Sequence, residues 1–177
     1  LPGRRILSAL EPFIAKGEAL RHDSGHDPWY AIVKGFAVLL ASDEPTAAVD
    51  RMRRLPPARL QNHFGRDLFA VLAACPRREA GEFLVELSRS LPPESASYPD
   101  LIDGLSANPQ PVCRSRMLEM AVKPDAQRAQ ESFRRNFVQL AHQDPAFGRA
   151  LQERALTLGE RERAIFVACL LDLESEA

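Results

Sequence analysis

The stretch from residue 66 to residue 91, RDLFAVLAACPRREAGEFLVELSRSL, decides the fold. Residues 66–75 form an apolar run, Pro76 marks a turn, and residues 77–91 carry apolar side chains at helical spacing. The stretch therefore predicts two helices joined at a proline turn. Prolines in similar settings stand on either side, and the gaps along the series are 33, 31, 33 and 36 residues: Pro12, Pro45, Pro76, Pro109 and Pro145. A recurrence of this length is typical of stacked two-helix repeats.

The repeat predicts an all-α protein, a right-handed superhelical α-solenoid of about five antiparallel helix pairs. The stretches in which apolar and polar residues alternate are too short to predict a sheet. We expect one domain over residues 1–177, with an irregular first unit (1–44) and clearer repeats (45–177). The expected helices cover 29–41, 46–54, 66–75, 77–91, 99–107, 110–122, 123–143, 146–158 and 160–173. A globular bundle punctuated by prolines is the alternative architecture.

Three dipeptides look like helix starts, with a capping side chain followed by proline at the first helical position: Asp27-Pro28, Asn108-Pro109 and Asp144-Pro145. The segments NPQPVCRSRML (108–118) and DPAFGR (144–149) resemble the inter-helix turn of HEAT repeats, in which Asp-Pro or Asn-Pro is followed by an apolar residue and arginine. The resemblance to the HEAT/armadillo class implies a binding scaffold. In bacteria such arrays often accompany signalling or NTPase domains.

Composition restricts the partners and the compartment. The formal net charge is −1, so no overall field draws the chain to nucleic acid or to anionic membranes. No apolar stretch reaches the ~20 residues of a membrane span, so no membrane partner is expected. The three cysteines, Cys75, Cys113 and Cys169, are isolated in apolar surroundings, which predicts buried thiols and a reducing, cytoplasmic location.

The chain is interpreted as a segment of a larger bacterial protein. It begins at Leu1 rather than methionine, and residues 161–173 read as the first helix of a further pair. Arginine greatly outnumbers lysine, since lysine occurs only at Lys16, Lys34 and Lys123, and this bias indicates a GC-rich genome.

No sequence motif identifies a reaction, a cofactor or catalytic residues. The best candidate metal ligands are His22, Asp23, His26 and Asp27, which lie close together in one segment. Their segment also contains Ser24 and Gly25, so we interpret it as a solvated turn and expect neither a metal nor another cofactor. A small metal-dependent hydrolase built on this loop remains one alternative function. The aromatic pair Trp29 and Tyr30 starts the next helix and is interpreted as core rather than as a binding site.

Five arginines form the candidate partner-binding site. Advancing 100° per residue round each second helix places them opposite the apolar side, as a row on one surface: Arg51, Arg54, Arg78, Arg89 and Arg114. The predicted function is a non-catalytic protein-binding scaffold or sensor module with an extended polar groove. The other alternative is nucleic-acid binding by a helical-repeat protein, including one similar to DNA glycosylases.

Overall fold

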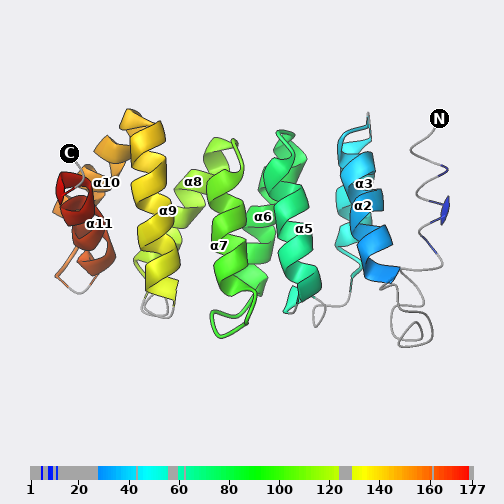
Figure 1. The fold of residues 1–177 in the computed structure, drawn as a ribbon, viewed down its shortest axis with the longest axis horizontal. Helices are drawn as coiled ribbons and strands as arrows, with labels where there is room; N and C mark the ends of the chain where they lie inside the picture. The colour runs from blue at the N-terminus through cyan, green and yellow to red at the C-terminus, as the bar shows by residue number, and fades with distance from the viewer. Residues whose placement is uncertain are drawn as a thin grey trace.

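The described part of the chain is all-α in the computed structural model and contains no β-strand. The structure describes residues 5, 8, 9, 11, 28–42, 44–55, 60, 61, 63–123, 129–160 and 162–175. Their helices follow one another along the long axis of the molecule (Figure 1). The predicted all-α class is confirmed for these residues.

The helices lie in two rows. The first row holds α2 (Pro28–Leu40), α5 (His63–Ala74), α7 (Tyr98–Ala107), α9 (Gln130–Gln143) and α11 (Ala164–Ser175). The second row holds α3 (Pro45–Met52), α6 (Arg78–Ser90), α8 (Pro111–Ala121) and α10 (Pro145–Thr157). Each first-row helix packs on the next one in its row, and each second-row helix packs on the first-row helix that precedes it. In the second row, α3 packs on α6 and α6 packs on α8, but α8 and α10 do not form a closely packed pair.

The proline turns predict the bounds of α6 and α10 to within one residue. α6 was expected over 77–91 and covers 78–90, and α10 was expected over 146–158 and covers 145–157. Three expected starts are wrong: α5 begins at His63 rather than at residue 66, α9 begins at Gln130 rather than at residue 123, and α11 begins at Ala164 rather than near residue 160. The backbone amides of Glu162 and Arg163 both donate to the carbonyl of Gly159, so a separate turn precedes this helix.

The apolar core fills the space between the two rows. Phe83 and Phe137, which helical spacing puts at apolar positions of their helices, are 2% and 0% exposed. The three cysteines are buried and unbridged, which confirms their predicted placement. Burial raises the pKa of the Cys113 and Cys169 thiols to about 12, so both stay protonated at neutral pH.

The predicted helix starts have different outcomes. Asp144 caps α10 as expected, because its carboxylate accepts a hydrogen bond from the Ala146 amide at 3.0 Å. The prediction for Asn108 is wrong: α8 begins at Pro111, and Asn108 is buried. Its side-chain amide donates instead to the carbonyls of Leu72 (2.9 Å) and Cys75 (3.1 Å), at the C-terminal end of α5. Asn108 therefore joins one helix pair to the previous pair.

An ion pair joins α11 to α9. The guanidinium of Arg134 donates two hydrogen bonds to the carboxylate of Asp172, one of them at 2.6 Å, through Nη2. These hydrogen bonds lower the pKa of Asp172 below its ordinary value, because they stabilise the charged carboxylate.

We expect Asp172→Asn to lower the melting temperature at neutral pH and to have little effect in acid. A lowered pKa in the folded state stabilises the protein above the ordinary Asp pKa of about 3.9, and this stabilisation is lost as the pH falls through the lower value. Thermal unfolding followed by circular dichroism between pH 7 and about pH 2 measures the difference. Glu94→Gln, at an exposed loop residue, is the control. A difference that persists at the acid end would contradict the role given to the ion pair.

Candidate functional site

The predicted arginines lie on or near the surface, and four of the five are paired with carboxylates. Arg51 and Arg54 both contact Glu11, although Arg54 does so only at 3.5 Å. Arg78 pairs with Glu82 one turn along α6, at 2.6 Å. Pairing within the chain reduces the positive charge that these side chains offer to a partner.

The other two predicted arginines differ from each other. Arg89 is exposed at the end of α6 and makes no ion pair within the described residues. Arg114 is only 34% exposed and pairs with Asp144, the residue that caps α10. Since Arg114 lies in the first turn of α8, this ion pair links the N-terminal ends of α8 and α10. The partner-binding role of the five arginines remains a prediction.

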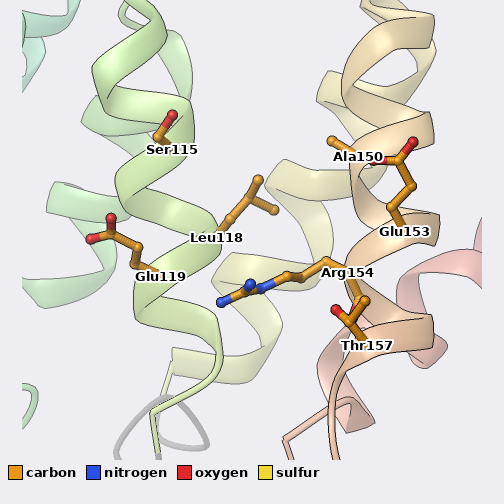
Figure 2. A pocket seen from close by; sticks show the side chains of 7 residues that line it. All are labelled: Ser115, Leu118, Glu119, Ala150, Glu153, Arg154 and Thr157. Atoms are coloured by element: carbon orange, nitrogen blue, oxygen red, sulfur yellow. The ribbon is translucent and has the colours of Figure 1, made fainter.

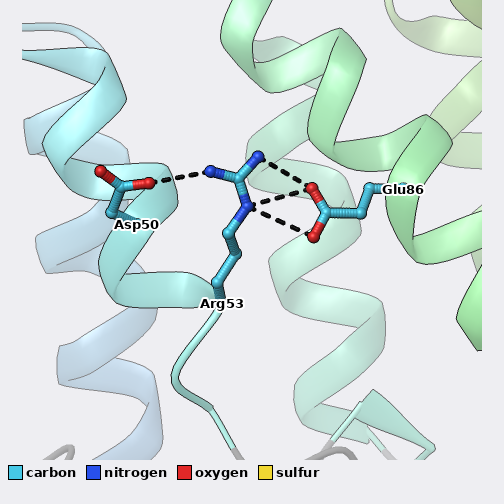
Figure 3. A network of polar contacts seen from close by, with 3 residues as sticks. All are labelled: Asp50, Arg53 and Glu86. Carbon is cyan, nitrogen blue, oxygen red and sulfur yellow. Dashed lines mark hydrogen bonds and ion pairs between the residues drawn. The ribbon is translucent and has the colours of Figure 1, made fainter.

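A single arginine joins α3 to α6 in the second row. Arg53 donates to Glu86 through Nε (3.0 Å) and Nη2 (2.8 Å), and to Asp50 through Nη1 (2.8 Å) (Figure 3). Its guanidinium also lies over the ring of Phe83, 5.8 Å from the centroid. The hydrogen bonds that Arg53 donates to the Glu86 carboxylate are the main cause of a raised pKa at Arg53.

A different arginine joins α6 to α8. Arg116 is buried and donates to Ser88 twice, to the hydroxyl at 2.7 Å and to the backbone carbonyl at 3.2 Å. Its third contact is Glu119 on its own helix, at 3.1 Å. The carbonyl of Ser88 lies in the last turn of α6, where backbone acceptors lack helical partners. Sequence reasoning missed Arg116, because helical phase alone does not show what it contacts.

Between α8 and α10, the next two helices of the second row, neither a link like that of Arg53 nor one like that of Arg116 is present. The second-row helices begin at residues 45, 78, 111 and 145. Counted from these starts, the same position is held by Arg53, directly after α3, and by Glu86, Glu119 and Glu153 in the three later helices. Glu119 therefore has the position of Arg53 but not its charge, and it cannot pair with Glu153. By the same register, Ala150 stands where Arg116 stands in α8, and its methyl group cannot reach the preceding helix.

A groove of about 470 Å³ lies at this step, between α8 and α10 (Figure 2). Leu118 points from α8 toward α10, and Arg154 extends from α10 across the groove toward α8. The remaining lining comes from Ser115, Glu119, Ala150, Glu153 and Thr157. The Arg114–Asp144 ion pair ties the two helices at their N-terminal ends, so the groove lies along their later turns.

The groove contains two charges that are not neutralised within the described residues. Glu153 and Arg154 make no ion pair there, whereas Glu119 is held by Arg116. An unpaired guanidinium beside an apolar surface is suited to a carboxylate, which it can bind through two parallel hydrogen bonds. The groove can therefore hold an apolar side chain against Leu118 and an acidic group at Arg154.

Two other hollows lie in the first row, and both are lined mainly by small residues. One, of about 580 Å³, lies between α2 and α5, and the other, of about 420 Å³, lies between α5 and α7. The carboxylates beside the second hollow already have partners: Asp100 contacts Arg66 at 3.8 Å, and Asp103 contacts Arg135 at 2.7 Å. These hollows offer less unpaired charge than the α8–α10 groove.

The predicted loop from His22 to Asp27 lies outside the described residues, as do the side chains of Trp29 and Tyr30. Within the described part of the chain, no three His, Cys, Asp or Glu side chains are grouped to hold a metal ion. No helix of that part is both long enough and apolar enough to span a bilayer. Comparisons with protein-family models, curated proteins and solved structures give no match.

Proposed function

We propose that this chain is a HEAT-like helical-repeat scaffold, a right-handed α-solenoid within a larger cytoplasmic bacterial protein, that binds a partner protein without catalysing a reaction. The α8–α10 groove is its binding site. The observation that carries this proposal is the groove between α8 and α10 in the second row, where Ala150 and Glu119 replace the two linking arginines. A row of helices that packs closely except at one place leaves side chains there free to contact a partner.

The proposed ligand is a segment of the partner that carries one large apolar side chain next to Asp or Glu. The apolar side chain would rest on Leu118 and the methyl group of Ala150, both of which line the groove. The carboxylate would pair with Arg154, which makes no ion pair within the described residues. The lining residues 150–157 cover about 10 Å along α10, which is enough for roughly two turns of a bound helix.

Selection from a displayed library of random 12-residue peptides, with the chain as bait, tests this function. We expect the enriched peptides to combine Leu, Ile or Phe with Asp or Glu. Arg154→Glu should weaken their binding by at least about tenfold, because an attractive charge contact becomes repulsive. Arg154→Lys should weaken binding less, since it keeps the charge but loses the two-bond geometry. Arg149→Glu is the control, at an exposed residue of the same helix that does not line the groove.

A second pair of variants tests whether the groove is the binding site without changing its charge. Ala150→Phe should block the groove and reduce binding, whereas Ala146→Phe, at an exposed alanine outside it, should not. Circular dichroism shows whether each variant is still folded. The groove is not the site if the selected peptides bind Arg154→Glu and Ala150→Phe as well as they bind the unchanged chain.

A further inference from the structure

An apolar surface lies on the outer side of the first row, where α2 packs beside α5. Its deepest part is the hollow of about 580 Å³ between the C-terminal halves of the two helices, and the larger apolar residues of its lining are Leu40, Val71 and Cys75. Val38 adjoins this hollow, because it lies one turn before the lining residue Ala41, and it is 53% exposed. The hollow and Val38 therefore form one apolar surface that a partner can contact.

Two opposite charges mark the ends of this surface on α5. Arg77 lines the hollow just after the C-terminal end of the helix, and Asp67 is exposed one turn before Val71 on the same helix face. Neither makes an ion pair within the described residues, and the neighbouring Arg66 contacts Asp100 on α7 instead. Asp67 and Arg77 are ten positions apart, which corresponds to about 15 Å at the rise of a helix.

These features fit an amphipathic helix that lies along α5. The apolar face of such a helix carries large side chains three or four residues apart, so one of them can enter the hollow while others contact Val38 and the exposed Ala74. An acidic residue at one end of the helix pairs with Arg77, and a basic residue at the other end pairs with Asp67. The two charges therefore specify the direction of the bound helix as well as its position.

The direction that suits both helices is antiparallel. The N-terminal end of the bound helix then lies at Arg77, beside the C-terminal ends of α2 and α5, and its C-terminal end lies at Asp67. An acidic residue in its first turn and a basic residue about three turns later are the charges that its own dipole favours. A parallel helix would need the opposite charges, each at the unfavourable end of its own dipole.

A second copy of this chain fits the same surface less well. α5 packed antiparallel on a second α5 would bring Arg77 near the second Asp67, but between these charges it offers only Ala70, Val71 and Ala74 as exposed or half-buried apolar side chains. None of these is large enough to fill a hollow of about 580 Å³. The hollow therefore favours a helix of another protein, with larger apolar side chains.

We propose that the α2–α5 face, formed by Val38, Asp67, Ala74, Arg77 and the hollow between them, binds an amphipathic helix of a partner protein antiparallel to α5. The bound helix carries Asp or Glu in its first turn, Leu, Ile or Phe along one face, and Lys or Arg about three turns later. This face lies in the first row and shares no residue with the α8–α10 groove, so it is a second binding site.

Fluorescence anisotropy with two synthetic helical peptides tests the proposal on the full 177-residue chain. One peptide carries glutamate in its first turn, leucines along one face and lysine about three turns later, and the other has the same residues with the two charges exchanged. We expect the first peptide to bind at least about tenfold more tightly than the charge-exchanged peptide. Equal affinities, or no binding of either peptide, overturn the proposal.

Exchange of the charges on the chain tests the direction of the bound helix. Arg77→Glu alone weakens binding of the first peptide by about tenfold, and Asp67→Lys combined with Arg77→Glu reverses the preference between the two peptides. Arg154→Glu, in the α8–α10 groove, leaves both affinities unchanged, so this result is independent of the proposed function. A double variant that keeps the original preference excludes the antiparallel arrangement.

Two exposed valines test the apolar part of the face. Val38→Asp weakens binding of the first peptide by about tenfold, because a carboxylate then faces its leucines, whereas Val112→Asp in α8 does not. Circular dichroism shows that each variant is folded. Equal binding by the two variants contradicts the proposal. Sedimentation velocity tests for a second copy at this face: self-association of the unchanged chain that Val38→Asp removes overturns the assignment to another protein.

Discussion

Phe137→Ala should lower the free energy of unfolding by about 3–5 kcal/mol, the range for removing a large buried aromatic side chain. Phe137 is fully buried on α9 and is the centre of a four-ring cluster. Its ring centroid lies 5.8 Å from that of Phe133, 5.6 Å from that of Phe147 and 5.7 Å from that of Phe166. The cluster joins α9, α10 and α11, so truncation leaves a cavity where three helices meet.

The damage should also be local. The helices pack mainly on their neighbours along the two rows, so α10 and α11 should open before α5 and α7. Denaturant unfolding measures the total loss, and hydrogen exchange locates it. Val112→Ala, at a valine that is 38% exposed, should cost less than about 0.5 kcal/mol and serves as the control. A loss below about 1 kcal/mol for Phe137→Ala would show that this cluster does not hold the three helices together.

The helices and their buried faces are predictable from the sequence because both depend on local patterns. Proline positions and helical spacing predict the limits of α6 and α10 to within about one residue, and they identify Phe83 and Phe137 as core residues. These features repeat along the chain, so each unit supports the interpretation of the next.

The links between helices are less predictable because their partners are distant in sequence. Helical phase puts Arg114 on the outer side of α8, but it does not show that Asp144, 30 residues later, pairs with it. The groove was missed for a related reason. Only an alignment of the second-row helices shows that Ala150 takes the place of Arg116, and that alignment needs the observed start of each helix.

Asn108 shows how one side chain can be assigned the wrong partner. The dipeptide Asn108-Pro109 looks like a helix start, but Pro111 offers a second first-turn position, and α8 begins there. Asn108 is then free to contact the preceding pair, where it donates to the carbonyls of Leu72 and Cys75 at the C-terminal end of α5. Its own Oδ1 accepts from the Gln110 amide at 3.0 Å, so all three contacts fix the side chain.

Asn108→Ala should therefore lower the free energy of unfolding by about 2–4 kcal/mol. The substitution leaves the Cys75 carbonyl and the Gln110 amide without this partner, whereas the Leu72 carbonyl keeps its hydrogen bond from the Cys75 amide. Each unsatisfied buried group costs about 1–3 kcal/mol before relaxation. Gln139→Ala removes an exposed amide from α9 and should change stability by less than about 0.5 kcal/mol. Denaturant unfolding of the three proteins measures both effects.

Asn108→Asp separates the hydrogen bonds from simple loss of volume. The aspartate keeps the shape of asparagine and can still accept from Gln110, but at neutral pH its carboxylate faces the carbonyl oxygens of Leu72 and Cys75. The variant should then be at least as unstable as Asn108→Ala. Burial beside those oxygens raises the pKa of the new carboxyl, so acid protonates it and allows it to donate to one carbonyl. The stability gap to the unchanged protein should therefore narrow as the pH falls below that raised pKa. A gap independent of pH, or an Asn108→Ala protein as stable as the Gln139→Ala control, would show that these contacts do not hold the helix pairs together.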